Sequence, residues 1–198
     1  MVTFVVLLTG CTRRPVRNDV NTPEGPATRQ ANVDDEIKSS PGADQAPYEL
    51  QFIDTVVELQ LRAIDAEQLV ATRAEHVELK QFSRQLIAEQ RSEITTLRQL
   101  RASWFGDKPA AVYLQLAGAS EALHAIDVAK LDPLKENAFD LEFIEEMTAY
   151  LKSVNKMGSD VLNEDSRPEL KQVVQNVVNG NGSRVEQLKA WETSWKKS

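Results

Sequence analysis

The chain is poor in the side chains that most often build catalytic or metal centres. Its 198 residues include one Cys and two His, and aromatic residues make up only 6%. A single Cys excludes an internal disulfide and any zinc or iron–sulfur site made of several thiolates. Two His far apart in sequence disfavour a multi-His metal site. Because no Ser or Cys nucleophile has a recognisable His/Asp setting and no glycine-rich phosphate loop is present, we expect that the protein is not an enzyme.

Positive charge is also in deficit. Lys and Arg number 23 against 30 Asp and Glu, which gives a formal net charge of −7. Since phosphate binding needs clustered Lys and Arg, this balance argues against nucleic acid as a partner. The composition leans to Leu, Ala, Glu, Gln and Lys, which favour helix, and no segment shows a series of alternating strands. An all-α fold is therefore predicted.

The N-terminal segment predicts a lipid anchor. Residues 2–8 form a short apolar stretch, far below the roughly 20 residues that span a bilayer, and it suits the apolar core of a secretory signal. Leu8-Thr9-Gly10-Cys11 looks like a bacterial lipobox, and lipidation of Cys11, with palmitate for example, would hold the protein on a membrane. No Lys or Arg precedes the apolar stretch, which leaves open a start further upstream. The alternative is an unmodified Cys after a chance apolar run.

Residues 12–47 predict a disordered tether between this anchor and a folded domain. The segment contains five prolines and many Asn, Asp, Ser and Thr residues, and almost nothing large and apolar. Such a segment cannot offset its ordering entropy by burial. We thus divide the chain into a lipoprotein signal and lipobox (1–11), a tether (12–47) and a folded part (48–198). The predicted location is the bacterial cell envelope, on the periplasmic face of the outer membrane if the source has two membranes.

The folded part contains an internal duplication. Phe52-Ile53-Asp54 recurs as Phe143-Ile144-Glu145, at an offset of 91 residues. The same offset relates Glu78-Leu79-Lys80-Gln81 to Glu169-Leu170-Lys171-Gln172, and Ser103-Trp104 to Ser194-Trp195. Chance does not give a constant offset over about fifty residues that ends in a rare Trp. The repeats cover about 48–104 and 139–195.

Each repeat predicts a helical hairpin. In the first repeat, apolar residues recur at three- and four-residue steps over 52–70 and again over 79–104, which marks one apolar face on each helix. The turn lies near residues 74–77. Two such hairpins pack most simply as a four-helix bundle. The connection between the repeats is long, and residues 110–131 predict an amphipathic helix that crosses the bundle.

Two features of the second repeat refine this prediction. Its turn lies at residues 163–168, where Ser166 suits a helix N-cap and Pro168 an early helical position. Residues 179–182 read Asn-Gly-Asn-Gly where the last helix should continue, and each Gly costs about 1 kcal/mol relative to Ala in a helix. Because the repeat keeps its register there, we expect a kinked or closely packed helix rather than a loop.

The repeated pattern resembles the bacterial family called domain of unknown function 305, a ferritin-like four-helix family. The resemblance covers roughly residues 48–196 and implies a ferritin-like bundle. Secreted and lipid-anchored members are usual in this family. The likeness rests on the start of each repeat, the turn with its His-Pro-Glu-Leu pattern, the second helix and its Trp-rich end: Phe52-Ile53-Asp54, Phe143-Ile144-Glu145, His76-Val77-Glu78-Leu79, Arg167-Pro168-Glu169-Leu170, Gln90, Glu93, Ile94, Trp104 and Trp195.

The chain departs from this family at the position that would bind metal. Family members carry an adjacent His pair in each copy, and the matching positions here are Leu59-Gln60 and Tyr150-Leu151. The trailing Met of the family is Ala66 in one copy and Met157 in the other. Imidazole and thioether ligands suit copper and other transition metals. The resemblance implies such binding, and the missing His ligands predict that it has been lost.

Carboxylates are the remaining candidates for metal ligands. The weak candidates are Asp54, Glu58, Asp65 and Glu145; of these, Asp54 and Glu145 occupy matching positions of the two repeats. Glu89 and Glu93 lie four residues apart on the next helix. A ferritin-like di-metal site uses Glu-x-x-His pairs, which these helices lack, so a solvated charged face is the simpler interpretation.

The remaining His and Trp residues have structural interpretations. His76 falls in a turn and is expected to be exposed or capping, and His124 stands alone on the connecting helix. Trp104, Trp191 and Trp195 are expected in the core or at the bundle ends, with a partner-binding surface as the alternative.

The function predicted from these patterns is that of a non-enzymatic cell-envelope lipoprotein without a cofactor. It would present a helical bundle for protein interaction or a structural role, after loss of the ancestral metal site. The alternative is an envelope protein that binds a divalent metal ion through carboxylates. The expected partners are the membrane, through lipidated Cys11, and an unidentified protein, with a homo-oligomer left open.

Overall fold

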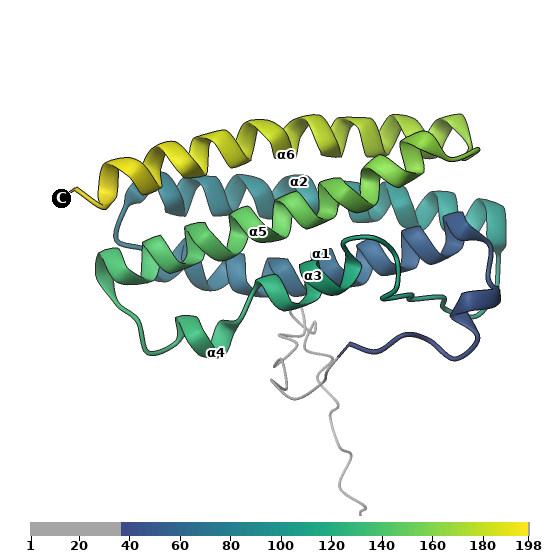
Figure 1. Cartoon of the computed structure of the whole chain (residues 1–198), viewed down its shortest axis with the longest axis horizontal. Coiled ribbons are helices and arrows are strands. Elements are labelled where there is room, and N and C mark those ends of the chain that lie inside the picture. The colour runs from purple at the N-terminus through teal and green to yellow at the C-terminus, as the bar shows by residue number, and fades with distance from the viewer. Residues whose placement is uncertain (1–36, 198) are drawn as a thin grey trace, which may run out of the picture. The chain divides into compact units, whose positions relative to one another are not determined.

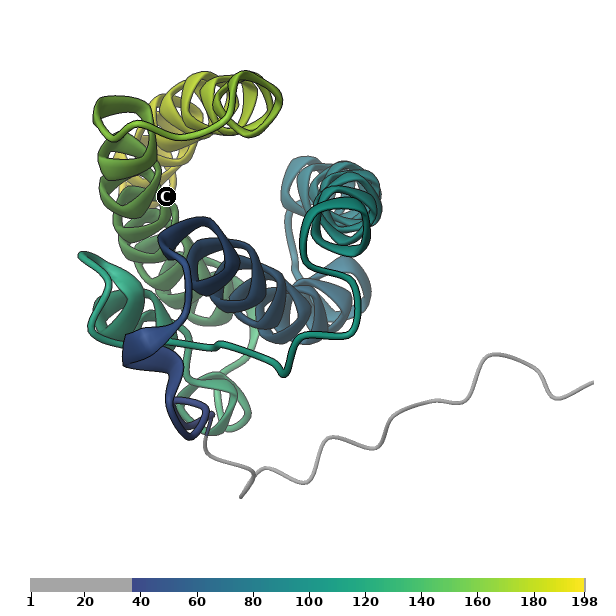
Figure 2. The ribbon, with the colours of Figure 1, turned by 90° about the vertical axis from the view of Figure 1, so that its right-hand side faces the viewer.

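The computed structural model describes residues 37–197, so Cys11 and most of the predicted tether lie outside the described residues. Four long helices dominate: α1 (Tyr48–Arg73), α2 (Val77–Phe105), α5 (Glu136–Asn163) and α6 (Pro168–Trp195) (Figure 1). They form two hairpins, α1–α2 and α5–α6, and α1 packs against α5 (Figure 2). The described part of the chain contains no strand. The predicted all-α four-helix bundle is confirmed.

The helix boundaries follow the duplication. The second helices of the two hairpins begin at Val77 and Pro168, which are 91 residues apart. Pro168 stands in the first helical turn as predicted, where its missing N–H costs nothing. The N-cap position, however, belongs to Arg167 rather than Ser166, whose buried hydroxyl has no hydrogen-bond partner among the described residues. The helix α6 continues through residues 179–182 without a loop, as the register of the repeat required.

The connection between the hairpins is helical only in part. It contains α3 (Ala119–Ala125) and α4 (Val128–Leu131), so the single helix predicted over 110–131 is wrong in extent. Gly118 interrupts it with a φ of 89° and lies so close to α5 that a Cβ there would come within 2.3 Å of the Ser153 carbonyl oxygen. Asp127 then starts α4 afresh, because its side chain accepts hydrogen bonds from two backbone N–H groups of that helix.

Residues 37–47 pack on the bundle, which corrects the C-terminal part of the predicted tether. The N–H of Ser40 donates to the carbonyl oxygen of Val112 at 2.8 Å, and the N–H of Val112 donates back to the Ser40 hydroxyl at 3.1 Å. A short 3-10 helix, η1 (Ala43–Gln45), follows, and the Gln51 side-chain amide donates to the carbonyl of Ala43 at 2.7 Å. Hydrogen bonds between Ser39 and Ser40 and the 112–114 segment supply order that composition alone did not indicate.

A continuous apolar core joins the four long helices. Its largest fully buried side chains come from α1, α2, α5 and the connection, and they include Phe139, Phe143, Ile53, Leu79, Leu97, Leu131 and Met147. Helix α6 adds Leu170 and Leu188, which are also fully buried. Within residues 37–197, no helix is both long enough and apolar enough to cross a membrane.

Candidate functional site

The positions at which the resemblance implies His pairs lie inside the bundle. Leu59 and Gln60 of α1 and Tyr150 and Leu151 of α5 are all at most 3% exposed. The duplication therefore brings the two matching positions to the interior of the same core. Two of the four side chains, Gln60 and Tyr150, are polar, and the polar groups around them define the candidate site.

Hydrogen bonds between α1 and α2 build a central polar layer. The Gln60 amide Nε2 donates to Glu93 Oε2 at 2.7 Å, and the Gln90 amide Nε2 donates to Glu67 Oε1 at 2.9 Å. Tyr150 of α5 lies within electrostatic reach of both carboxylates. We use the name central polar layer for Gln60, Glu67, Gln90, Glu93 and Tyr150. Four of the five are at most 3% exposed, the exception being Glu93, which is half-buried.

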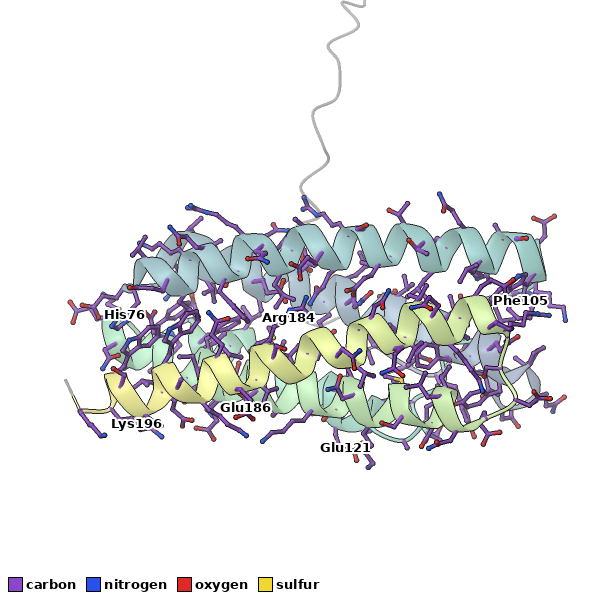
Figure 3. The ribbon with its side chains drawn as sticks, turned by 90° about the horizontal axis from the view of Figure 1, so that it is seen from above. His76, Phe105, Glu121, Arg184, Glu186 and Lys196 are labelled. Carbon is purple, nitrogen blue, oxygen red and sulfur yellow. The ribbon has the colours of Figure 1, made fainter. Side chains whose placement is uncertain are left out.

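Helix α6 closes this layer with a basic side chain. Arg184 forms an ion pair with Glu89 of α2, and its Nη1 donates to Asn181 Oδ1 at 2.7 Å (Figure 3). Gly180 lies one turn before Arg184, and a Cβ at Gly180 would come within 3.1 Å of the guanidinium. The segment thus supplies a buried amide at Asn181, and Gly180 leaves room for the arginine. Nothing in the structure explains Gly182, where an added Cβ would meet no atom within 4 Å.

Burial shifts the protonation of the acids in the layer. Loss of solvent raises the pKa of Glu67 to about 8, against the opposing effects of the Gln90 hydrogen bond and the Arg184 charge. Burial also raises the pKa of Glu93, which Arg184 and Gln60 oppose. The pKa of Tyr150 is raised well above its usual value, first by burial and then by Glu67 and Glu93. Glu67 is therefore a neutral acid at pH 7.

Four oxygens of the layer have no hydrogen-bond partner among the described residues. They are Gln60 Oε1, Glu67 Oε2, Gln90 Oε1 and the Tyr150 hydroxyl. A buried polar group left unpaired costs about 1–3 kcal/mol, and native proteins hold few of them. Their concentration in one layer makes it the most polar region of the core and the candidate functional site.

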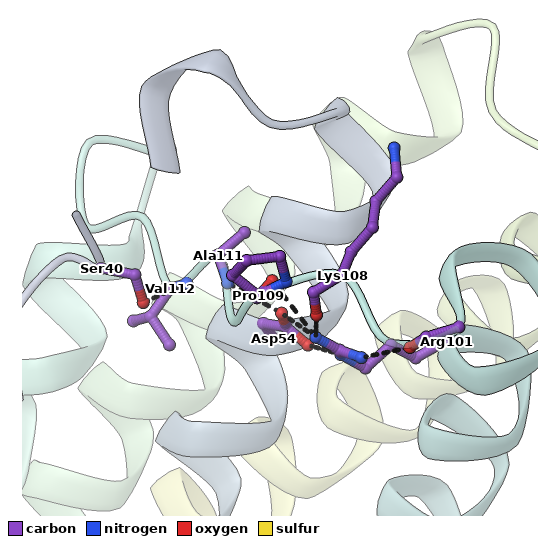
Figure 4. Close-up of polar contacts among 8 residues, drawn as sticks. Ser40, Asp54, Arg101, Lys108, Pro109, Ala111 and Val112 are labelled. Carbon is purple, nitrogen blue, oxygen red and sulfur yellow. Dashed lines mark hydrogen bonds and ion pairs between the residues drawn. The ribbon is translucent and has the colours of Figure 1, made fainter. Parts of the chain in front are cut away.

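Asp54, the first metal candidate from the sequence, has a structural role. Its Oδ1 accepts the Arg101 Nε at 2.6 Å, and its Oδ2 accepts the backbone N–H of Ala111 at 2.9 Å (Figure 4). Arg101 also donates to the carbonyl oxygen of Lys108 at 2.9 Å. The carboxylate therefore ties the first turns of α1 to the end of α2 and to the following loop.

The other sequence candidates do not join Asp54. Glu58 is half-buried, and Asp65 and Glu145 are exposed. Within residues 37–197, no group of three or more His, Cys, Asp or Glu side chains is placed to hold a metal ion. These four carboxylates are thus spread over two helices instead of converging on one centre.

His76 belongs to an aromatic stack at one end of the bundle. Its ring lies 3.7 Å from Trp195 in a nearly parallel stack, and Trp191 continues the stack at 5.4 Å. The buried carboxylate of Asp140 is 2.8 Å from His76 Nδ1 and accepts the backbone N–H groups of Glu75 and His76. His76 occupies the N-cap position of α2, but its ring makes no capping bond and is only partly exposed.

Trp104 and His124 lie elsewhere. Trp104 packs at the opposite end of the bundle, where the Arg167 guanidinium stands 4.5 Å from its ring centre. His124 is exposed on α3, with Nδ1 2.7 Å from the Ser120 carbonyl oxygen. The three tryptophans occupy bundle ends as expected, and Trp104 does not share a surface with the Trp191–Trp195 pair. Neither His contributes to the central polar layer.

Comparison with known proteins identifies the family. The model of the family described as domain of unknown function (DUF305) matches residues 49–192. The chain belongs to this family. A search of curated proteins gives no match.

Solved structures similar to this DUF305 member include several of a protein called CopM. The Cu(II)-bound form of CopM is 26% identical, with a TM-score of 0.64 over 74% of this chain and 97% of that chain. The Cu(I)-bound form is 25% identical, with a TM-score of 0.64 over 76% and 99%. An Ag-bound form is 24% identical, with a TM-score of 0.63 over 74% and 96%. The resemblance to the family is confirmed, and the fold is shared with CopM.

The side chains of the layer in this DUF305 member do not fit Cu(I) or Ag(I). Copper(I) and silver prefer soft thioether, thiolate or imidazole ligands. The donors here are carboxylate, carboxamide and phenol oxygens, and both His residues lie outside the layer. The likeness in fold to CopM is therefore not accompanied by a copper-type donor set at this place.

Sequence reasoning missed the layer, although the duplication contains a signal for it. An offset of 91 places Gln90 on Asn181 and Glu93 on Arg184. Glu93 and Arg184 thus occupy matching positions of the two repeats, and both are charged. The helical pattern directs these positions inward. Two matching inward positions of opposite charge, on α2 and α6, would have pointed to an internal polar network.

Proposed function

We propose that this chain is a non-enzymatic, lipid-anchored protein of the bacterial cell envelope, whose helical bundle has a structural or protein-binding role without copper chemistry. One observation carries the second half of this proposal: Gln60, at a position implied to be His, is hydrogen-bonded within the oxygen-rich central polar layer. Oxygen donors of this kind are poor ligands for Cu(I) and Ag(I).

The packing around these positions supports the proposal. Leu59 and Leu151 fill the other two positions with aliphatic carbon and are at most 2% exposed. A bundle that kept an open soft-metal site would have to place donors there. Instead, apolar packing and amide–carboxylate hydrogen bonds hold the helices together, which suits a scaffold better than a metal carrier.

The envelope location rests on the N-terminal sequence. Leu8-Thr9-Gly10-Cys11 has the form of a lipobox, and it lies outside the described residues. Acyl chains on a single Cys hold a protein on a membrane without a spanning helix. Such an anchor would leave the bundle free to face a partner.

Metal titration tests the loss of copper chemistry. The full chain carrying Cys11→Ala would be titrated with Cu(I), Cu(II) and Ag(I) by calorimetry, since this change removes the one thiol that could bind these ions. We expect no binding tighter than micromolar.

A matched variant shows that the assay can detect a site in this fold. It combines Leu59→His, Gln60→His, Tyr150→His and Leu151→His, which restores the two His pairs, and it should gain copper binding. Tight copper binding by the Cys11→Ala chain itself would overturn the proposal, and its loss in Gln60→Leu would place the bound copper in the central polar layer.

A further inference from the structure

The outer face of α2 is positively charged, although the chain as a whole carries a net charge of −7. Helix α2 lies along one edge of the bundle and packs mainly against α1 (Figures 2 and 3). Between residues 81 and 103, its exposed positions hold Arg84, Arg91 and Arg98, and otherwise only Gln, Ser, Thr and Ala. We use the name arginine stripe for these three arginines. Among the exposed positions of this range there is no acid and no large apolar side chain.

The stripe is straight because its arginines are seven residues apart. Seven residues rise about 10.5 Å and complete almost two helical turns, so the three side chains project from nearly the same side over about 21 Å. Arg84 Nη2 donates to the carbonyl oxygen of Ala71 at 3.1 Å. The guanidinium groups of Arg91 and Arg98 have no hydrogen-bond or ion-pair partner within residues 37–197. Two guanidinium groups on this face are therefore available to an outside partner.

The acids of α2 between residues 81 and 103 do not neutralise the stripe. Glu89 forms an ion pair with Arg184 of α6, and Glu93 accepts a hydrogen bond from Gln60 of α1. Both acids thus engage the neighbouring helices and not the outer face of α2.

The duplication provides a matched comparison for the stripe. An offset of 91 residues places its three positions on Gln175, Gly182 and Lys189 of α6. Lys189 is paired with Glu186, so the corresponding face of α6 is neutral. The positive face belongs to α2 and is not a general property of the repeated hairpin.

We propose that the arginine stripe docks the bundle on a membrane surface of anionic phospholipids. Guanidinium groups pair bidentately with phosphate oxygens, and attraction between basic side chains and anionic lipids requires no apolar contact. A protein interface, by contrast, has a core of aromatic and other apolar side chains, which this face of α2 lacks. Charge complementarity without an apolar core therefore favours a lipid surface over a protein partner.

This docking rests on the lipid anchor of the proposed function and adds the face of the bundle that meets the membrane. Residues 12–36 would join Cys11 to the described part of the chain, and a segment of that length reaches up to about 85 Å. A tethered bundle meets the surface at a high local concentration, so a weak attraction is enough to orient it. The acids on the far side of the bundle oppose docking little, because charges more than about 8 Å apart are largely screened at physiological salt. The faces of α5 and α6 stay available to a protein partner.

Vesicle binding measures the attraction. The full chain carrying Cys11→Ala would be sedimented, in about 0.15 M salt, with vesicles of phosphatidylcholine alone and with vesicles of equal parts phosphatidylcholine and phosphatidylglycerol. Each arginine near an anionic surface adds about fivefold to the partitioning, so Arg91→Gln combined with Arg98→Gln should lower binding to the anionic vesicles about twentyfold. Binding to phosphatidylcholine alone should be the same for both proteins. Salt at about 1 M, where the screening length falls to about 3 Å, should remove the preference for anionic vesicles.

Two further double variants serve as controls. Lys152→Gln combined with Lys189→Gln removes the same charge from exposed positions on α5 and α6 and should bind as the parent does. Arg91→Lys combined with Arg98→Lys keeps the charge of the stripe and should keep most of the binding. Because none of these chains carries a lipid, failure of the predicted anchor in cells would leave the vesicle result unaffected.

A pair of equivalent serines tests the orientation. Ser92 on α2 and Ser183 on α6 are both exposed and are related by the offset of 91 residues. A fluorophore on Ser92→Cys in the Cys11→Ala chain should be quenched by lipids that carry a nitroxide at the headgroup, and one on Ser183→Cys should be quenched far less. Equal quenching at the two sites, or equal partitioning of the parent and the Arg91→Gln and Arg98→Gln variant, would overturn the inference. Tighter binding of the parent to poly-L-glutamate than to anionic vesicles would also overturn it, since the stripe would then suit an acidic protein.

Discussion

Replacing Glu67 with Gln should stabilise the bundle, although Glu67 is fully buried and hydrogen-bonded. The unfolded chain loses this proton near the ordinary pKa of 4.5, whereas burial keeps it on the folded protein up to about 8. Between these two pH values the folded state binds one more proton than the unfolded state. The free energy of unfolding contributed by Glu67 is therefore full below pH 4.5 and is lost as the pH rises to 8.

The size of this effect follows from the shift. At 1.36 kcal/mol per pKa unit, the displacement from 4.5 to about 8 corresponds to about 5 kcal/mol, of which about 3 kcal/mol is already lost at pH 7. Glu67→Gln keeps the acceptor for the Gln90 amide and removes the titration. Its advantage over the parent should be near zero at pH 4.5 and grow to about 3 kcal/mol at pH 7.

Urea unfolding at pH 4.5, 7 and 8.5 measures this difference. Burial also raises the pKa of Glu146, and its contribution is common to both proteins. Burial raises the pKa of Glu93 too, and because the charge of Glu93 acts on Glu67, the difference between the two curves contains the Glu67 titration together with this coupling. Glu121→Gln serves as the exposed control and should follow the parent. The reasoning would be refuted if the stability gained by Glu67→Gln did not grow with pH.

Three further predictions concern other parts of the chain. Asp54→Asn weakens the charge-assisted bonds to Arg101 and should lower the free energy of unfolding by about 1–3 kcal/mol in urea; an unchanged midpoint would contradict this role. Gly158→Ala places a Cβ 2.8 Å from Val178 and should cost about 1–3 kcal/mol in the same assay, whereas stabilisation would show that α5 and α6 have room to part. Cys11→Ala should move the protein from the detergent phase to the aqueous phase when lysates of the expressing bacteria are partitioned with detergent. Continued membrane association of this variant would refute the lipid anchor.

The fold could be predicted because the duplication and the helical period agree. The offset of 91 residues fixed where both second helices begin, and the same register carried α6 through residues 179–182. The connection was harder, since residues 110–131 are amphipathic enough for one helix. The close approach of Gly118 to α5 and the capping by Asp127 divide it, and both depend on tertiary contacts.

The candidate site was harder to predict for a different reason. Helical periodicity assigns polar residues to the solvent face, whereas Gln60, Glu67 and Gln90 are buried polar residues among apolar ones. Asp54 is the opposite case. An acid recurs at its position in both repeats, which suggested a metal ligand, but its partners are Arg101 and a loop N–H. Such roles are decided by hydrogen-bond partners on other helices and loops. The spacing of residues along one helix does not predict which partners these are.

We infer that the interior of this DUF305 member is an oxygen-based polar layer and not a copper centre. The most direct test is a crystal of the protein grown with excess copper, with an anomalous difference map recorded at the copper absorption edge. We expect no copper peak between Gln60 on α1 and Tyr150 on α5. A copper peak at that place, coordinated by side chains of the layer, would contradict it.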